Sequence, residues 1–302
     1  MLHGLIVINK QPQITSHDVV SRVRKIFRIQ KVGHFGTLDP MAEGLLLVGI
    51  GHVTKFFDFY VRKRKLYTGV IQFGVATDTY DRMGRPLSEP RPVDLYHEDL
   101  RSLKKKFTGS VLQRPPVYSA KKKNGKPLYR YARQNIDVRI PASRVHIYRL
   151  ELLIQAPDRL YFSAETSAGT YIRSLAHDLG QALKVGAHLK ELKRERIGEF
   201  SLKDAVNLDQ LDAGMPPGDL IRYVQPIETL LPEFPALTLS HQGEVIARNG
   251  GTVFKRHITR VEAQKERGEF FRLFTLNGRF VALARRAEKA VGFKPFIVLP
   301  DQ

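Results

Sequence analysis

The sequence contains no cysteine, which excludes disulfides, thiolate nucleophiles and cysteine-ligated zinc. Its ten histidines are scattered, without a spacing such as HExxH, so no metal site is expected. No apolar run is long enough to cross a bilayer. The first ten residues, MLHGLIVINK, have the pattern of a strand rather than of a signal peptide. These absences predict a cytoplasmic protein that works without a metal or a membrane.

Acidic residues are scarce relative to basic ones. The 302 residues include 30 Asp and Glu against 49 Lys and Arg, a formal net charge of +19. A surface this positive attracts polyanions, and nucleic acid is the first candidate. Generic basicity is the alternative.

The positive charge is concentrated in residues 112–135, which contain no acid. Tyr118, Tyr129 and Tyr131 are interleaved with the basic side chains. Because cations neutralise phosphates and aromatic faces stack on bases, this mixture favours an RNA strand. The basic residues expected to contact RNA are Lys121, Lys122, Lys123, Lys126, Arg130 and Arg133.

Hydrophobic periodicity predicts both helices and strands, which by itself indicates an α/β protein. The segment TSHDVVSRVRKIFRI has a helical pattern, with Ser16 as the expected cap and Asp18 complementing the helix dipole. DLRSLKKKFTG and TYIRSLAHDLGQALK are also expected to be helices. The expected strands are EGLLLVGIG, KLYTGVIQFG, RVHIYRLELLIQA and RLYFSAETSAG.

Composition shifts near DAGMPPGD and LLPEFPAL, which places a domain boundary at about residue 230. Residues 1–230 would form the first domain. Residues 231–302, including GEVIARNGGTVF, alternate as short strands with glycine turns, which predicts a small β-barrel or sandwich. The stretch RPPVYSAKKKNGKPLYRYARQN has the pattern of a long loop with Asn124-Gly125 at its tip.

Asp39 lies in the glycine-rich stretch VGHFGTLDPMAEG. Pro40 disfavours helical geometry at Asp39, and the flanking glycines permit sharp turns, so a turn aspartate that bonds its own backbone is the first interpretation. The alternative is catalytic. Neighbouring cations would keep the carboxylate ionised, and a charged carboxylate aimed at bound RNA can act as a nucleophile.

The stretch KVGHFGTLDPMAEGLLLVGIGHVTK resembles the signature of the TruB family of tRNA pseudouridine synthases. Other blocks agree with that family in the same order, and the tail more faintly resembles a PUA-type RNA-binding domain. The resemblance covers residues 4–200 and rests on KLYTGVIQFGVATDTYDRMG, PPVYSAKKKNGKPLYRYARQNI, SAGTYIRSLAHDLG and, more loosely, GAHLKELKRERIG.

The resemblance implies an α+β pseudouridine synthase fold, in which helices and long loops flank a mixed, mostly antiparallel central sheet. In that fold residues 114–140 would form a loop that closes over bound RNA. It also implies an isomerase activity. Such enzymes act on one uridine of the tRNA T loop, conventionally numbered 55: they break its N-glycosidic bond, turn the base and rejoin it through carbon. Nothing is added or lost, so no cofactor is implied. The implied partner is tRNA, bound through its T arm, with no obligate protein partner.

The same resemblance assigns roles to three catalytic residues. Asp39 would be the nucleophile, and whether it attacks the sugar or the uracil ring stays open. Tyr67 would pack on the target base and help to remove the proton from C5. Arg173 would pair with Asp39 and hold it ionised and oriented.

Five further residues are implied to contact the substrate. His34 would stack in the gap that the extruded uridine leaves, because the reacting atoms of a stacked base are inaccessible. Tyr171 would contact the nucleotide, and Leu192 would form an apolar wall. Lys10 would line the pocket from the first strand, and Asp81 would lie near the site.

The chain departs from the family pattern in four places, two of which are Asn135, where glycine is common, and the LKRERIG block, which is less arginine-like than usual. Near the N-terminus it reads Lys10-Gln11-Pro12-Gln13 in place of Lys-Pro-x-Gly, and Phe35 replaces a smaller residue.

Two other functions remain as alternatives. A dyskerin-like, guide-RNA-dependent synthase is less favoured because the chain starts close to the first strand. A non-catalytic RNA-binding or RNA-folding protein would share the charge, and tRNA-folding assistance could also accompany catalysis.

Overall fold

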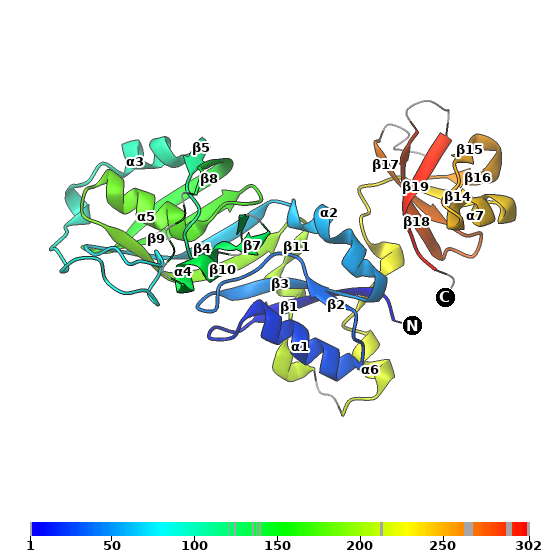
Figure 1. Ribbon diagram of the computed structural model, residues 1–302, viewed down its shortest axis with the longest axis horizontal. Coiled ribbons are helices and arrows are strands. Elements are labelled where there is room, and N and C mark those ends of the chain that lie inside the picture. The colour runs from blue at the N-terminus through cyan, green and yellow to red at the C-terminus, as the bar shows by residue number, and fades with distance from the viewer. Residues whose placement is uncertain are drawn as a thin grey trace.

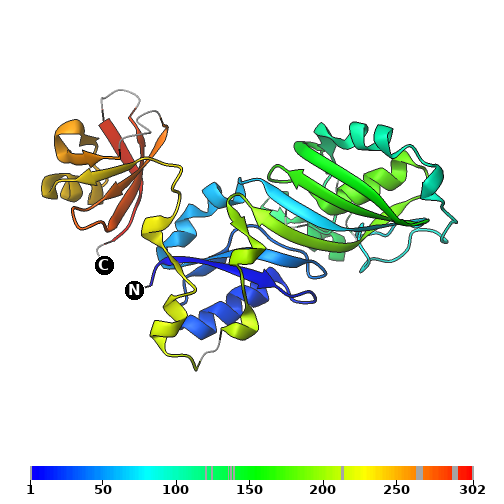
Figure 2. The same cartoon turned by 180° about the vertical axis from the view of Figure 1, so that it is seen from behind.

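Two β-sheets lie side by side along the long axis of the computed structural model (Figure 1). The larger one is formed by strands between Gly4 and Pro226, and the smaller one by strands between Ala236 and Val298. From behind, a single connecting segment links the two (Figure 2). The structure describes residues 2–119, 121–123, 125–134, 136, 138, 140–211, 214–262, 268–287 and 292–300.

The larger sheet has eleven strands within the described residues, and its main path runs β12-β1-β3-β10-β4-β9-β8-β5. Of the pairs along that path, β1–β12 and β3–β10 are parallel and the others antiparallel, which confirms the predicted mixed, mostly antiparallel sheet. The strands are β1 (Gly4–Lys10), β2 (Val32–His34), β3 (Glu43–Ile50), β4 (Lys65–Phe73), β5 (Gly109–Gln113), β8 (Ser143–Ala156), β9 (Arg159–Thr166), β10 (Ala187–Ile197), β11 (Phe200–Ser201), β12 (Val206–Asn207) and β13 (Gln225–Pro226).

Helices cover different parts of this sheet. α5 (Ile172–Ala182) and α3 (Leu100–Phe107) pack on β4, β8 and β9 in one apolar cluster, whereas α1 (Ser16–Phe27) packs on β1 and β3 (Figure 1). Side chains of β1 alternate, so that Ile6 and Ile8 face α1 while Leu5 and Val7 belong to another cluster. Two further helices are short, α2 (Phe57–Val61) and α6 (Pro217–Ile221).

The N-cap of α1 is Thr15, so the expectation that Ser16 caps this helix was wrong. Thr15 and Asp18 form a capping box, with the Asp18 N–H donating to Thr15 Oγ1 over 3.1 Å. Ser16 is already helical and buried. Its hydroxyl instead binds the backbone of Leu38, accepting from the N–H at 2.9 Å and donating to the carbonyl at 3.1 Å. Helix α1 therefore supports the loop that carries Asp39.

Residues 114–140 are not one long loop. They contain a two-stranded ribbon, β6 (Lys122–Lys123) and β7 (Lys126–Pro127), followed by helix α4 (Leu128–Arg133). Pro127 precedes the helix, a position that requires no intrahelical N–H. The loop prediction was wrong for these residues because such a short helix has too few apolar positions to reveal its period.

The smaller sheet pairs in the order β15-β19-β18-β17-β14-β16 and is nearly closed, which confirms the predicted barrel-like tail. Its helix α7 (His241–Arg248) corrects the expectation that GEVIARNGG is a strand, because Ser240 caps it by accepting from the Gly243 N–H. The strands are β14 (Ala236–Leu239), β15 (Val253–Phe254), β16 (Ile258–Val261), β17 (Phe270–Phe274), β18 (Phe280–Arg286) and β19 (Gly292–Val298).

The segment between the sheets is held from both sides. Leu230 and Leu231 are buried in a cluster that also contains Phe280 and Leu299 of the smaller sheet. Arg272 of β17 donates to the carbonyls of Leu230 and Phe234 at 3.4 and 2.9 Å. We propose a domain boundary near residue 230, where these contacts hold the connecting segment against the smaller sheet.

Phe35, which the family pattern does not explain, belongs to this same apolar cluster. Its ring is 1% exposed, stacks on Tyr60 with centroids 5.2 Å apart, and lies where a Cβ on Gly49 would come within 2.5 Å of it. The larger side chain is therefore matched to Gly49 on the neighbouring strand. Phe35 contributes packing, not substrate contact.

Replacing Phe35 by alanine is expected to lower the free energy of unfolding by about 3–5 kcal/mol, because it leaves a cavity in a closed cluster. Phe57, whose ring lies 6.2 Å from that of Phe35 but is 43% exposed, supplies the control: Phe57→Ala should cost much less. Urea denaturation of both variants measures the difference. Equal losses would show that Phe35 has no special packing role.

Candidate active site

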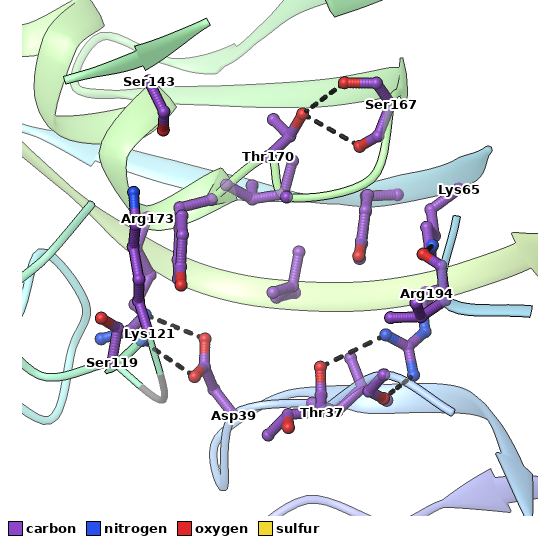
Figure 3. A pocket seen from close by; sticks show the side chains of 18 residues that line it. Thr37, Asp39, Lys65, Ser119, Lys121, Ser143, Ser167, Thr170, Arg173 and Arg194 are labelled. Atoms are coloured by element: carbon purple, nitrogen blue, oxygen red, sulfur yellow. Dashed lines mark hydrogen bonds and ion pairs between the residues drawn. The ribbon is translucent and has the colours of Figure 1, made fainter. Parts of the chain in front are cut away.

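A cavity of about 500 Å³ opens where the start of α5 faces the loop after β2 (Figure 3). β4 and β10 contribute side chains to it, and so do the residues that follow β9. Its lining residues are Gly36, Thr37, Leu38, Asp39, Val61, Lys65, Tyr67, Ser119, Lys121, Ser143, Ser167, Gly169, Thr170, Tyr171, Ile172, Arg173, Leu192 and Arg194.

Asp39 sits in a tight turn at the edge of this cavity. Gly36 has a φ of +108°, a conformation that residues with a Cβ rarely adopt, and the Ala42 N–H donates to the Asp39 carbonyl over 3.0 Å. The turn leaves the Asp39 side chain 29% exposed. Its carboxylate is thus half-buried yet reachable from the cavity.

Arg173 reaches this carboxylate from the first turn of α5. Its Nη2 donates to Asp39 Oδ1 over 2.9 Å, and its Nε lies 2.9 Å from Asp39 Oδ2, so both carboxylate oxygens are engaged (Figure 3). The arginine side chain is only 6% exposed. The hydrogen bond and the ion pair together fix the orientation of the carboxylate.

The same guanidinium is held from behind by other segments. Nη1 donates to the carbonyl of Thr79 over 3.1 Å and lies 3.5 Å from Asp81 Oδ2, while Nη2 also donates to the carbonyl of Tyr118. Asp81 is 5% exposed and is itself fixed by the Thr79 hydroxyl at 2.7 Å. Arg173 therefore bridges two carboxylates, of which only that of Asp39 faces the cavity.

Tyr67, Leu192 and Tyr171 also line the cavity. Tyr67 on β4 is 8% exposed and Leu192 on β10 is 6% exposed. Burial raises the pKa of Tyr171. Together these side chains give the cavity the apolar, aromatic walls that a flat ring requires.

Arg194 was missed by the sequence reasoning. It is 1% exposed, and its guanidinium donates to the carbonyls of Leu45 at 2.8 Å, Gly36 at 3.0 Å and Thr37 at 3.3 Å (Figure 3). It thus binds the backbone just before Asp39. Residues two apart on a strand share a face, so Leu192 already carried the signal that Arg194 points the same way.

Lys65 lines the cavity as well and was also missed. It is 5% exposed, and its ammonium donates to the carbonyls of Lys63 and Val61 at the end of α2. Burial, with the charge of Arg194, lowers its pKa to about 8. Two buried cations therefore lie on the β4 and β10 side of the cavity.

Lys10 is not among the residues that line the cavity. It is fully buried below the Asp39 turn, where its ammonium donates to the carbonyls of Ile14 at 2.8 Å and Pro40 at 3.4 Å. Gln13, at the family's glycine position, adopts a φ of +69° and its N–H donates to the same Pro40 carbonyl over 2.7 Å. The departure in sequence thus keeps a left-handed residue under the turn.

Burial lowers the pKa of Lys10 from 10.5 to about 8, against the opposing effect of Asp39. Between about pH 8 and pH 10.5, Lys10 is protonated in the unfolded chain but largely deprotonated in the folded one. This lysine therefore makes the free energy of unfolding rise with pH. We expect the stability difference between the unsubstituted protein and Lys10→Met to grow from pH 8 to pH 10. Urea unfolding at each pH measures it, with exposed Lys105→Met as a control whose difference stays constant. A pH-independent difference for Lys10→Met would contradict the prediction.

His34 lies outside the cavity lining, on β2, and is half-buried. Burial and the charges of Arg194 and His17 lower its pKa, so the ring is neutral at pH 7.

Of the predicted RNA-binding residues, Lys121 lines the cavity, and Lys126 and Arg130 are exposed. The side chains of Lys122, Lys123 and Arg133 lie outside the described part of the structure.

Comparison with known proteins bears on this site. The family model "TruB family pseudouridylate synthase (N terminal domain)" matches residues 24–172, and "tRNA pseudouridylate synthase B C-terminal domain" matches residues 173–232. The chain is 45% identical over 249 residues to tRNA pseudouridine synthase B of Solibacter usitatus, covering 82% of this chain and 85% of that protein. The chain belongs to the TruB family of pseudouridylate synthases.

Membership of the TruB family confirms the resemblance and makes the chain an isomerase. Its relative in Clostridium perfringens (strain 13), also named tRNA pseudouridine synthase B, is 37% identical over 97% of each chain. Among solved structures, that of a Cbf5-Nop10-Gar1 complex is 26% identical with a TM-score of 0.70, covering 97% of this chain and 83% of that one. The TruB fold is thus shared along nearly the whole chain.

Two negative observations concern the described residues only. No group of three or more His, Asp or Glu side chains there is placed to hold a metal ion. In the same part of the chain, none of the helices has the length and apolar character needed to span a membrane.

Proposed function

We propose that this chain converts one uridine in the T loop of tRNA, conventionally uridine 55, to pseudouridine. The observation that carries the proposal is the double contact between Arg173 and Asp39 at the rim of a cavity walled by Tyr67 and Leu192. An ionised, oriented carboxylate beside an apolar slot for a flat ring fits a nucleophile acting on an extruded base. The names of the relatives support tRNA as the substrate.

In the proposed reaction, the N1–C1′ bond breaks, the uracil turns, and a C5–C1′ bond forms. The proton leaves C5 and a proton is bound at N1, so product and substrate are isomers and no co-substrate is required. Asp39 is the nucleophile, Tyr67 packs on the base and assists proton removal from C5, and Arg173 keeps Asp39 charged. Asp81 acts through Arg173, and the buried ammonium of Lys10 supports the Asp39 turn.

The residues around the cavity would bind the RNA. The base must leave its stack, at a cost of a few kcal/mol, and the neutral ring of His34 would recover part of that cost by stacking. Tyr171 would contact the nucleotide. The basic residues of segment 114–140, Lys121 and Lys126 among them, would bind the backbone phosphates. We propose a cytoplasmic location, no cofactor, and a first domain of residues 1–230 that carries all of the chemistry.

The decisive experiment incubates the protein with an unmodified tRNA transcript that carries tritium at uridine C5, without guide RNA or cofactor. We expect release of about one equivalent of tritium per tRNA, and none from a transcript whose T-loop uridine is replaced by cytidine. Binding without release from correctly folded tRNA would contradict catalysis and favour an RNA-binding role. Release only with a guide RNA would favour the dyskerin-like alternative.

A further inference from the structure

Gln113, the last residue of β5, pairs with the backbone of a residue 58 positions away. Its Nε2 donates to the carbonyl of Tyr171 over 2.9 Å, and the Tyr171 N–H donates back to Gln113 Oε1 over 2.8 Å. The side chain is buried, at 2% exposure. The Gln113 carboxamide thus makes with Tyr171 the two hydrogen bonds that the backbone of a neighbouring strand would otherwise make.

A third hydrogen bond joins the same two segments. The Ser174 hydroxyl donates to the carbonyl of Arg114 over 2.7 Å. The end of β5 is therefore attached to the first turn of α5 on both sides of Arg173.

Tyr171 is the N-cap residue of α5, and its side chain makes no capping hydrogen bond. Its carbonyl accepts from the Leu175 N–H over 3.1 Å, which starts the helix, and from Gln113 at the same time. Arg173 is the second residue of that helix. The direction in which the Arg173 side chain leaves the helix thus depends on where Gln113 holds Tyr171.

We propose that Gln113 is a positioning residue for the isomerisation, which acts by fixing Tyr171 and the start of α5 so that Arg173 meets both oxygens of Asp39. The inference rests on the proposed function of the cavity. Gln113 itself is not among the residues that line the cavity. A displacement of about 1 Å at such a contact can reduce the rate by about 10²-fold.

The first test is Gln113→Leu, which removes both hydrogen bonds at similar volume. Gln72→Leu is the matched control, because Gln72 also uses its Nε2 on carbonyls, those of Phe73 and Asp158, at the far end of β4. We expect kcat to fall about 10–100-fold for Gln113→Leu, with KM for tRNA changed less than about threefold. The control should keep its kcat. Urea unfolding of both variants corrects for any difference in the folded fraction.

Gln113→Glu separates positioning from a merely structural role. At neutral pH its carboxylate accepts from the Tyr171 N–H but repels the carbonyl, whereas the protonated form can donate again. The ratio of its kcat to that of the unsubstituted protein is therefore expected to rise as pH falls from 8 to 5.5. Lys106 and Asp178 line a small cavity beside Gln113, and burial raises the pKa of Asp178 to about 6. Both are present in each protein, so the ratio removes the part of their titration that the substitution leaves unchanged.

The outcomes are separable. An unsubstituted protein without turnover would overturn the proposed function. An active protein with equal kcat values for Gln113→Leu and Gln72→Leu would overturn the positioning role. If Gln113→Leu does not fold, the pH profile of Gln113→Glu decides, and a pH-independent ratio overturns the role.

Discussion

Replacing Asp39 by asparagine is expected to reduce the turnover of tRNA by at least about 10³-fold while tRNA affinity changes less than about threefold. Asparagine has nearly the shape of aspartate and retains one oxygen that can accept from Arg173, but its amide is a poor nucleophile. RNA affinity depends mainly on phosphate contacts, which the substitution does not touch. Single-turnover tritium release and filter binding measure the two effects.

Asp58→Asn is the control for this experiment. Asp58 is exposed in the first turn of α2 and outside the cavity lining, so this variant should turn over normally. If Asp39→Asn were active at more than a few per cent of the unsubstituted rate, Asp39 could not be the nucleophile. If it lost tRNA affinity instead, the turn would have a binding role.

Removing the guanidinium of Arg173 is the second change with a large expected effect. Arg173→Met leaves the carboxylates of Asp39 and Asp81 without this cation, and the carbonyls of Thr79 and Tyr118 without this donor. Breaking a buried ion pair on one side costs about 3–5 kcal/mol. We expect a stability loss of that size together with a fall in kcat of at least about 10²-fold, measured by urea unfolding and single-turnover kinetics.

Two comparisons make this result specific. Arg196→Met removes an exposed pair with Glu165, whose 2.9 Å contact should be worth less than about 1 kcal/mol. Adding Asp81→Asn to Arg173→Met removes one unpaired charge and should restore part of the lost stability. If the double variant were no more stable than Arg173→Met, the buried charge of Asp81 would not be the cause of the loss.

The regular parts of this fold could be predicted from their apolar side chains, which alternate along much of β4 and form short continuous runs in β1 and β3. β1, β3 and β4 were expected where they occur, since apolar residues recur on their buried faces. Two short helices escaped detection, α4 with six residues and α7 with eight, whereas α3, also of eight residues, was expected from DLRSLKKKFTG. Cap propensity alone cannot choose between adjacent Thr15 and Ser16, but the capping-box spacing from Thr15 to Asp18 favours Thr15.

The proposed catalytic residues could be predicted from the sequence only in combination. On local grounds Asp39 is a turn aspartate, and it is proposed as the nucleophile only when the motif around Arg173, 134 positions away, is considered with it. Gln113 and Arg194 were missed for a related physical reason. Both are buried polar side chains that bind the backbone of distant segments. Local sequence periodicity does not predict which distant backbone group a side chain binds.

The pairing of β1 has a consequence for the order in which a newly made chain can fold. β1 lies between β3 and two later strands, with Ile8 opposite Val206 and Leu5 opposite Gln225. During synthesis the first strand therefore leaves the ribosome long before its outer partners, and its unpaired edge is open to other chains in the interval. Arg173 likewise emerges well after Asp39. A nascent chain therefore cannot bring Asp39 and Arg173 together until α5 has been translated, and both edges of β1 are paired only after β12 and β13 have followed.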